Sequence, residues 1–309
     1  MSRKACVSGS FYDSDVKLLN ENIEKFFKNN FHELPTESTD KRSITAAVAP
    51  HAGYVYSGST ASYTFNEIAK DGIPETIIIL GPNHTGYGDK LAMTSDDTWE
   101  MPFGTMEVDT EFKKELVNTS NEMTIDEFAH YHEHSIEVEL PFLQYISKLQ
   151  NKEIKIVPII ISLQYPQLCV NLARDIYEVS QKLNRDIIVL ASTDLTHYED
   201  SESASKKDHK VLKSIENMDI NEMIDNINTY QITMCGYGPV ITAIEYSKLM
   251  NANRSKCLNY SCSGDAFGDY DSVVGYGSAI IKKMKEKLFP SIQETFLIMR
   301  INYTNSLQE

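Results

Sequence analysis

The sequence predicts a single α/β domain whose mostly parallel or mixed central sheet has helices on both faces. Short runs in which almost every residue is apolar, at 44–50, 76–80 and 186–192, are typical of strands covered on both sides. Segments with helical spacing of apolar residues lie between such runs. The chain has 309 residues, 41% of them hydrophobic, which is enough for a sizeable core.

The first half of the chain predicts alternating strands and helices. After a helix over 15–30 comes a polar loop over 31–43, which contains Pro35. A glycine-punctuated turn at 51–58 separates the first core strand from the next helix, and residues 91–108 indicate irregular or antiparallel structure. Ser135 is expected to cap a helix, with Glu137 and Glu139 in its first turns. The other expected elements are a helix over about 59–69, a strand at 76–80 and the helix at 135–149.

The second half continues this alternation and completes one domain. Strands are expected at 154–162, 186–192, 257–261 and 272–281, and helices at 165–183, 201–217, 220–226 and 236–250. We interpret residues 1–282 as the domain and residues 283–309 as a helical and polar extension, which is a candidate oligomer contact.

Composition excludes several classes of protein. The net charge is −15 and no basic stripe is present, which argues against nucleic acid as the main partner. No apolar run approaches the roughly 18 residues of a membrane span, and the first residues lack the apolar core of a signal peptide. The 5 cysteines are odd in number and lack C-x-x-C spacing, so they indicate a reducing compartment. We therefore expect a cytoplasmic protein without a membrane partner.

Familiar catalytic motifs are absent from the sequence. It contains no G-x-G-x-x-G after a strand and no Walker A loop, so no nucleotide cofactor is expected. It also lacks the G-x-S-x-G elbow and the H-E-x-x-H helix; His132 and His134 are two residues apart, not four. The chemistry must therefore come from a less common arrangement.

Candidate metal ligands follow three of the predicted core strands. His51 ends the first strand, His84 ends the second, and Asp194 follows the strand at 186–192, with His197 three residues later. A single histidine at a strand end is more often structural than a ligand. Ligands nevertheless collect at the carboxyl ends of strands in α/β sheets, so the four residues together indicate one site, in which Asp194 either binds metal or orients an imidazole.

Two further residues are candidates for the same site. Cys235 precedes a predicted helix, whose N-terminus would favour the thiolate that binds metal or attacks; the alternative is an inert buried thiol. In the cluster at 130–134, His134 is the best placed to enter a site, whereas His130 and His132 are expected in a solvated loop.

Taken together, these motifs resemble the Memo family, whose archaeal and bacterial members are also described as the B component of the AmmeMemoRadiSam system. The resemblance covers residues 5–282, and the order and spacing of its motifs make it specific. The motifs are SGSFY (8–12), APHAGY (49–54), LGPNH (80–84), EHSIE (133–137), STDLTHY (192–198), CG (235–236), SGD (263–265) and SVVGY (272–276).

The resemblance implies a fold similar to class III extradiol dioxygenases, which use non-haem iron. It assigns His51, His84 and Cys235 as metal residues, with Asp194 and His197 beside them. Iron or copper is the expected metal, and zinc is an alternative. Two departures stand out: Cys235 takes the place of the dioxygenase carboxylate, and Val7-Ser8 replaces a histidine that often precedes the N-terminal motif.

Two functional hypotheses follow. The first is a metal-dependent redox or oxygenase-like protein in which His134, His197 and Asp194 act near an open coordination position. The second is a binding module whose pocket takes a peptide end or a small anion at a vestigial site. An assembly role beside a radical-SAM partner is suggested by the resemblance alone.

Overall fold

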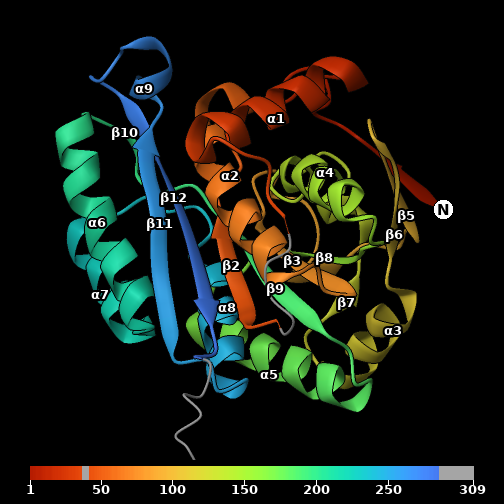
Figure 1. The fold of residues 1–309 in the computed structure, drawn as a ribbon. Helices are drawn as coiled ribbons and strands as arrows, with labels where there is room; N and C mark the ends of the chain where they lie inside the picture. Colours follow the sequence, from red (N-terminus) through yellow and green to blue (C-terminus); the bar gives the residue numbers. More distant parts are fainter. Residues whose placement is uncertain (37–41, 285–309) are drawn as a thin grey trace, which may run out of the picture.

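The computed structural model describes residues 1–36 and 42–284, and these form the predicted α/β architecture around a 12-stranded mixed sheet (Figure 1). The extension predicted from residue 283 onward lies almost wholly outside the described residues. The strands are β1 (Ser2–Lys4), β2 (Ile44–Ala49), β3 (Thr76–Pro82), β4 (Leu91–Met93), β5 (Thr98–Met101), β6 (Gly104–Val108), β7 (Thr124–Ile125), β8 (Lys155–Ile161), β9 (Ile187–Ser192), β10 (His197–Glu199), β11 (Arg254–Cys262) and β12 (Val273–Lys282).

Helices alternate with these strands along the chain. They are α1 (Val16–Phe31), α2 (Tyr54–Asp71), α3 (Thr110–Thr119), α4 (Leu140–Gln150), α5 (Pro166–Lys182), α6 (Ser201–Asn217), α7 (Ile220–Tyr230), α8 (Tyr237–Leu249) and the single-turn α9 (Gly264–Phe267). Short 3₁₀ turns occupy Glu127–Ala129 and Glu137–Glu139.

The centre of the sheet is parallel, and the strands beyond β2 are antiparallel. Strands β8, β3, β9 and β2 are neighbours in that order and run in the same direction. Strand β12 pairs antiparallel with β2, and β11 pairs antiparallel with β12. The predicted mixed sheet is therefore confirmed, and the arrangement is consistent with the dioxygenase-like fold that the resemblance implies.

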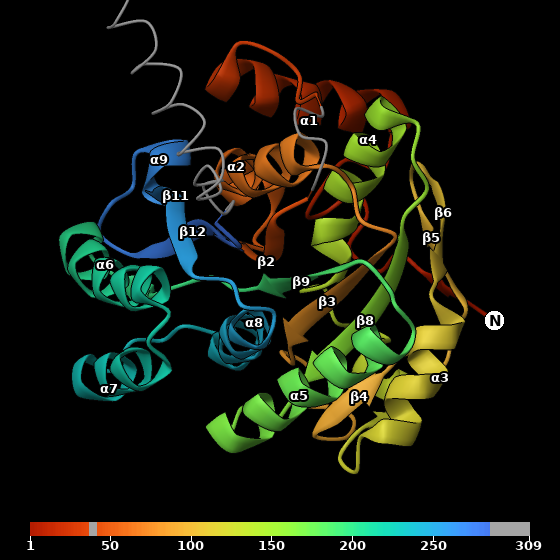
Figure 2. The ribbon, with the colours of Figure 1, turned by 60° about the horizontal axis from the view of Figure 1, so that its bottom comes forward.

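Two cores lie on opposite faces of the sheet because successive strand residues point to opposite sides. Ala47 and Ile79 pack with α1, α2 and α4, whereas Val48 and Ile78 pack with α3, α5 and α8. Figure 2 shows α1, α2 and α4 above the sheet and α5 and α8 below it. Helices cover both faces of the central strands, which explains why these strands are apolar at almost every position.

The predicted turn at 51–58 is wrong in its second half. Helix α2 begins at Tyr54, and Gly53 is its N-cap. Gly58 lies inside the helix, where a Cβ would stand 2.5 Å from the ring of Phe26 on α1. This glycine therefore permits close helix packing and does not mark a turn.

The start of the helix predicted at 135–149 is also wrong. Helix α4 begins at Leu140, after the 3₁₀ turn, and Ser135 does not cap it. The Ser135 hydroxyl donates instead to the carbonyl of Pro82, 2.9 Å away. Glu137 and Glu139, expected in the first turns of this helix, lie in the preceding 3₁₀ turn and are buried.

The segment after β6 holds a helix that apolar spacing did not indicate. Asp109 caps α3 by accepting a hydrogen bond from the backbone N–H of Phe112 at 3.0 Å. The antiparallel structure expected over 91–108 is confirmed by the β5–β6 hairpin. Within residues 1–36 and 42–284, no helix has the length and apolar character needed to cross a bilayer.

Candidate metal centre

Two histidines meet where two parallel strands of the central sheet end. His51 follows β2 and His84 follows β3, and β9 lies between these two strands in the sheet. The two imidazole rings have centroids 5.1 Å apart and are nearly perpendicular. The sheet topology thus brings together two candidate ligands that are 33 residues apart in the sequence.

Cys235 completes a set of three ligand atoms. It lies just before α8, and its Sγ is 3.3 Å from Nε2 of His51. The ligand atoms of His51, His84 and Cys235 all lie within 4.8 Å of one another. Nitrogen and sulfur ligands sit about 2.0–2.3 Å from zinc, so this spacing suits a shared ion of similar size.

His51 is held firmly and is neutral. Its side chain is buried, its Nδ1 lies 2.7 Å from the Ser192 hydroxyl, and its backbone N–H donates to Asp194 at 2.9 Å. Burial, assisted by the neighbouring histidines, lowers the pKa of His51 well below the usual value. Neutral imidazole is the form that binds metal.

Glu133 orients His84. Its Oε1 lies 3.0 Å from Nδ1 of His84, and the carboxylate also accepts the backbone N–H of His84. An ionised carboxylate can only accept, so the His84 proton sits on Nδ1 and Nε2 is free. Burial opposes ionisation of Glu133, but the hydrogen bond from His84 and the histidine charges lower the pKa to about 2.

A second set of potential ligands overlaps the first. Ligand atoms of His84, Glu133 and His134 also lie within 4.8 Å of one another. However, Oε1 of Glu133 already accepts backbone N–H groups from His134 and Ser135, both at 2.9 Å. We therefore interpret Glu133 as a support for the ligands and not as a ligand.

The His134 ring lies against the rings of His84 and His51. Its ring centroid is 4.6 Å from that of His84 and 5.4 Å from that of His51, and Phe11 covers it at 4.8 Å. Burial lowers the pKa of His134, although the Glu133 carboxylate opposes this shift. His134 is thus a neutral imidazole at neutral pH, able to accept a proton.

His197 is the first residue of β10. Its Nδ1 lies 2.7 Å from the carbonyl of Leu195 and 3.0 Å from that of Thr233. Carbonyl oxygens only accept, so the proton of the neutral ring is on Nδ1. Burial lowers the pKa of His197, and the positive charge of a protonated His84 would add to this shift.

Asp194 organises the backbone next to the centre. Its carboxylate accepts N–H groups from His51 and Ala52, and it is not among the grouped ligand atoms. Burial raises the pKa of Asp194 to about 7, against the lowering effect of these hydrogen bonds. Of the two roles expected for Asp194, the geometry favours that of an orienting residue.

The surroundings of Cys235 do not favour the thiolate that the sequence led us to expect. Burial, followed by the negative charge of Asp194, raises the pKa of the Cys235 thiol well above its usual value. These effects outweigh the helix N-terminus that begins at Tyr237. In the metal-free protein Cys235 is a neutral thiol, so it is a poor nucleophile but remains a potential ligand that loses its proton when metal binds.

Sequence reasoning missed the network that holds the loop at 127–139. The Arg3 guanidinium forms a buried ion pair with Glu137 at 2.7 Å and donates to the carbonyls of His130 and Glu133. The Tyr12 hydroxyl donates to the same Glu137 carboxylate at 2.7 Å. The N-terminal segment thereby fixes the loop that carries Glu133 and His134.

The expectation that His130 lies in a solvated loop is wrong. It is fully buried and not part of a solvated loop, with Nε2 3.1 Å from the carbonyl of Ala92 and its ring against Trp99. Burial lowers the pKa of His130 to about 4. His130 is therefore a neutral core residue and not a site residue.

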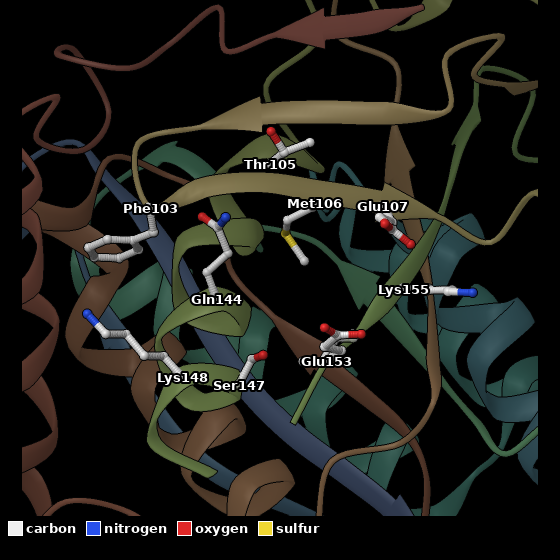
Figure 3. A pocket seen from close by; sticks show the side chains of 10 residues that line it. Phe103, Thr105, Met106, Glu107, Gln144, Ser147, Lys148, Glu153 and Lys155 are labelled. Atoms are coloured by element: carbon white, nitrogen blue, oxygen red, sulfur yellow. The ribbon is translucent and has the colours of Figure 1, made fainter. Parts of the chain in front are cut away.

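One pocket of about 340 Å³ lies away from this centre (Figure 3). It lies beside Lys155, the first residue of β8, whereas the histidines lie past the carboxyl ends of β2 and β3. None of the candidate site residues lines it. Its lining comprises Phe103, Thr105, Met106, Glu107, Gln144, Ser147, Lys148, Glu153, Ile154 and Lys155.

The fold and the centre together define an α/β protein with a candidate His/His/Cys metal site at the carboxyl edge of its sheet. The family model described as "Memo-like protein" matches residues 3–280. The chain belongs to this family.

Individual relatives agree with this assignment. The chain is 40% identical to a MEMO1 family protein of Methanopyrus kandleri, with 92% of this chain and 100% of the relative covered. It is 41% identical to one of Pyrococcus furiosus, with the same coverage. A crystal structure of an uncharacterized Escherichia coli K12 protein shares the fold, with a TM-score of 0.53 at 12% identity over 77% of this chain and 99% of that one.

The Arg3–Glu137 pair should contribute strongly to stability. Replacing one partner of a buried pair leaves an uncompensated charge, so Arg3→Met should lower the free energy of unfolding by about 3–5 kcal/mol at pH 7. Chemical denaturation measures this loss, and Arg254→Met, which changes an exposed arginine, is the control.

The same pair predicts a pH dependence. Although burial raises the pKa of Glu137, Arg3 and the hydrogen-bond donors bring it below the usual value. Its stabilisation is therefore complete above the unfolded pKa of about 4.3 and is lost as the pH falls. The stability difference between wild type and Arg3→Met should shrink below that pH, and an undiminished difference would contradict the ion-pair account.

Proposed function

We propose that the protein is a metal-dependent redox or oxygenase-like protein whose ion is held by His51, His84 and Cys235. The observation that carries the proposal is the convergence of their three ligand atoms within 4.8 Å at the carboxyl edge of the sheet. Each imidazole has a hydrogen-bonding partner on Nδ1, which leaves Nε2 for the ion.

Iron, copper and zinc are the metals that this set of ligands could hold. A thiolate is a soft ligand and suits copper(I) or zinc, whereas imidazole suits iron, copper and zinc alike. Two histidines and one cysteine therefore favour copper(I), zinc or an iron whose electronic properties differ from those of a His/His/carboxylate site. Of these metals, iron and copper supply electron-transfer chemistry when bound, and we propose one of them.

The surrounding residues handle protons and solvent. His134 and His197 are neutral at neutral pH, so each can accept a proton from a substrate bound beside His84. His84 is the most exposed of the three ligands, with a third of its side chain open to solvent. A small-molecule substrate would therefore enter on the His84 side, with His134 at one wall.

The wider setting of this activity is also a proposal. The net charge of −15 supports a protein that avoids nucleic acid, and 5 cysteines without pairing support a cytoplasmic location. A radical-SAM partner and assembly into a homo-oligomer are proposed from the family resemblance and from the chain beyond residue 282.

Metal content tests the proposal directly. Protein purified anaerobically without chelators should carry near-stoichiometric iron or copper by mass spectrometry. Loss of a residue that only supports a metal ligand weakens metal binding by about 10–100-fold. His51→Ala and Cys235→Ser remove ligands and should weaken it further. His209→Ala and Cys257→Ser change the same residue types elsewhere and should retain metal; equal retention in all four variants would refute the assignment.

One observation favours a second candidate function, a peptide-binding module. Among the described residues, 9 tyrosines and phenylalanines are exposed, and 8 of these lie in α2, in β10, in α9 or in the segments that follow β3, β7, β8 and α9. Tyr56 and Phe267 contact each other, with ring centroids 5.5 Å apart. Exposed aromatic groups of this kind mark interaction surfaces, and they favour a peptide over a small anion. We call these eight residues the aromatic rim: Tyr56, Tyr87, Phe128, Tyr131, Tyr165, Tyr198, Phe267 and Tyr270.

This second function predicts that peptides bind the aromatic rim. Peptides selected on the metal-free protein from a random library should lose about 10-fold or more in affinity for Tyr198→Ser and Phe267→Ser, since a buried aromatic contributes at least about 1.4 kcal/mol to a good interface. Tyr230→Ser, which changes the exposed aromatic residue outside the rim, is the control. Fluorescence anisotropy measures the affinities, and equal loss in all three variants would contradict the rim as the binding surface.

A further inference from the structure

Glu139 is a buried carboxyl group that no cation neutralises. Its side chain is 1% exposed, and Oε2 has no hydrogen-bond partner. Within residues 1–36 and 42–284, no lysine, arginine or histidine forms an ion pair with it. A buried ionised carboxylate without a partner is costly, so this residue needs another explanation.

The Ser192 hydroxyl links Glu139 to the metal centre. Its Oγ lies 2.7 Å from Nδ1 of His51, 2.6 Å from the carbonyl of Ser135 and 2.9 Å from Oε1 of Glu139. All of these groups are buried in the protein. The Ser192 hydroxyl therefore contacts three polar groups. It can donate one hydrogen bond and accept two.

Counting donors and acceptors determines where the protons are. The Ser192 hydroxyl is within donating distance of both the Ser135 carbonyl, at 2.6 Å, and Oε1 of Glu139, at 2.9 Å. The carbonyl is the nearer of the two and can only accept, so we place the hydroxyl proton toward it. Both lone pairs of Oγ are then left to accept, which requires His51 to donate from Nδ1 and Glu139 to donate from Oε1. An ionised Glu139 would instead place two acceptors against a single hydroxyl proton.

Electrostatics point the same way. Burial raises the pKa of Glu139 well above its usual value; the hydrogen bond with Ser192 opposes the shift, and the nearby Asp194 carboxyl adds to it. The neutral acid can donate to Ser192, whereas the carboxylate cannot.

We infer that Glu139 is held as a neutral carboxylic acid and, by donating to Ser192, locks that hydroxyl so that His51 keeps its proton on Nδ1. Nε2 of His51 then faces Cys235 as a free lone pair, 3.3 Å from Sγ. Glu139 is thus a positioning residue that acts on a metal ligand through Ser192. The assignment of His51 as a ligand rests on the proposed function, but the proton arrangement does not.

Infrared spectroscopy of the metal-free protein tests the protonation of Glu139. At a pH of about 8.5, Asp194 is ionised because its pKa is about 7. Wild type and Asp194→Asn should both show the carbonyl stretch of a buried carboxylic acid, and Glu139→Gln should lose that band. Circular dichroism confirms that each variant is folded. An identical band in wild type and Glu139→Gln would overturn the inference.

Nitrogen-15 NMR of the His51 ring tests the positioning role. Wild type and Glu139→Gln should keep the proton on Nδ1, because a glutamine amide also donates to Ser192. Glu139→Met frees the hydroxyl and should admit the other tautomer, and Ser192→Ala should do so more fully. Ser278→Ala removes a buried hydroxyl that lacks a hydrogen-bond partner and is the control. A His51 proton on Nε2 in wild type, or an unchanged tautomer in both Glu139→Met and Ser192→Ala, would overturn the role.

These experiments need no bound metal. Loss of metal binding would refute the proposed function while leaving the infrared and NMR results to decide the role of Glu139. Conversely, failure of the tautomer test leaves the three metal ligands in place.

Discussion

Four carboxyl groups buried beside the carboxyl edge of the sheet are the constraint on which the site depends. A buried carboxyl group must be hydrogen-bonded, paired or neutral, because desolvation penalises its charge. Glu133 accepts several N–H groups, Glu137 is paired with Arg3, Asp194 accepts the backbone N–H of His51, and Glu139 has the Ser192 hydroxyl as its hydrogen-bond partner. Each solution fixes a loop or a ring, so the acids together determine where the imidazoles point.

Strand ends position the two histidines, and loops supply the residues that surround them. Parallel strands β2 and β3 place His51 and His84 at one edge, and α8 brings Cys235 to them. The loop at 127–139 then supplies Glu133 and His134, and the N-terminal segment holds that loop from the opposite side through Arg3. Residues far apart in the sequence are thus joined by hydrogen bonds that are mostly shorter than 3.1 Å, which produces a preorganised centre on a rigid sheet.

Sequence patterns predicted the sheet and the ligands but not their supports. Apolar strands that end at His51 and His84 can be read locally, since burial on both faces and the strand-end position are properties of short segments. The role of Glu133 depends on contacts across 49 residues, and that of Arg3 on contacts across 134. Glu137 and Glu139 were expected in the first turns of a helix, and their burial depends on tertiary packing that the local sequence does not show. The Gly58 error has the same origin, because its partner Phe26 lies on another helix.

X-ray absorption at the metal edge of the iron- or copper-loaded protein tests the central claim most directly, since it reports the atoms bound to the ion. The account predicts one sulfur ligand at about 2.3 Å and two imidazole nitrogens at about 2.0–2.1 Å, by analogy with the distances of such ligands to zinc. The sulfur contribution should disappear in Cys235→Ser. A spectrum of the wild-type protein without sulfur scattering, or with only oxygen neighbours, would contradict the His/His/Cys centre.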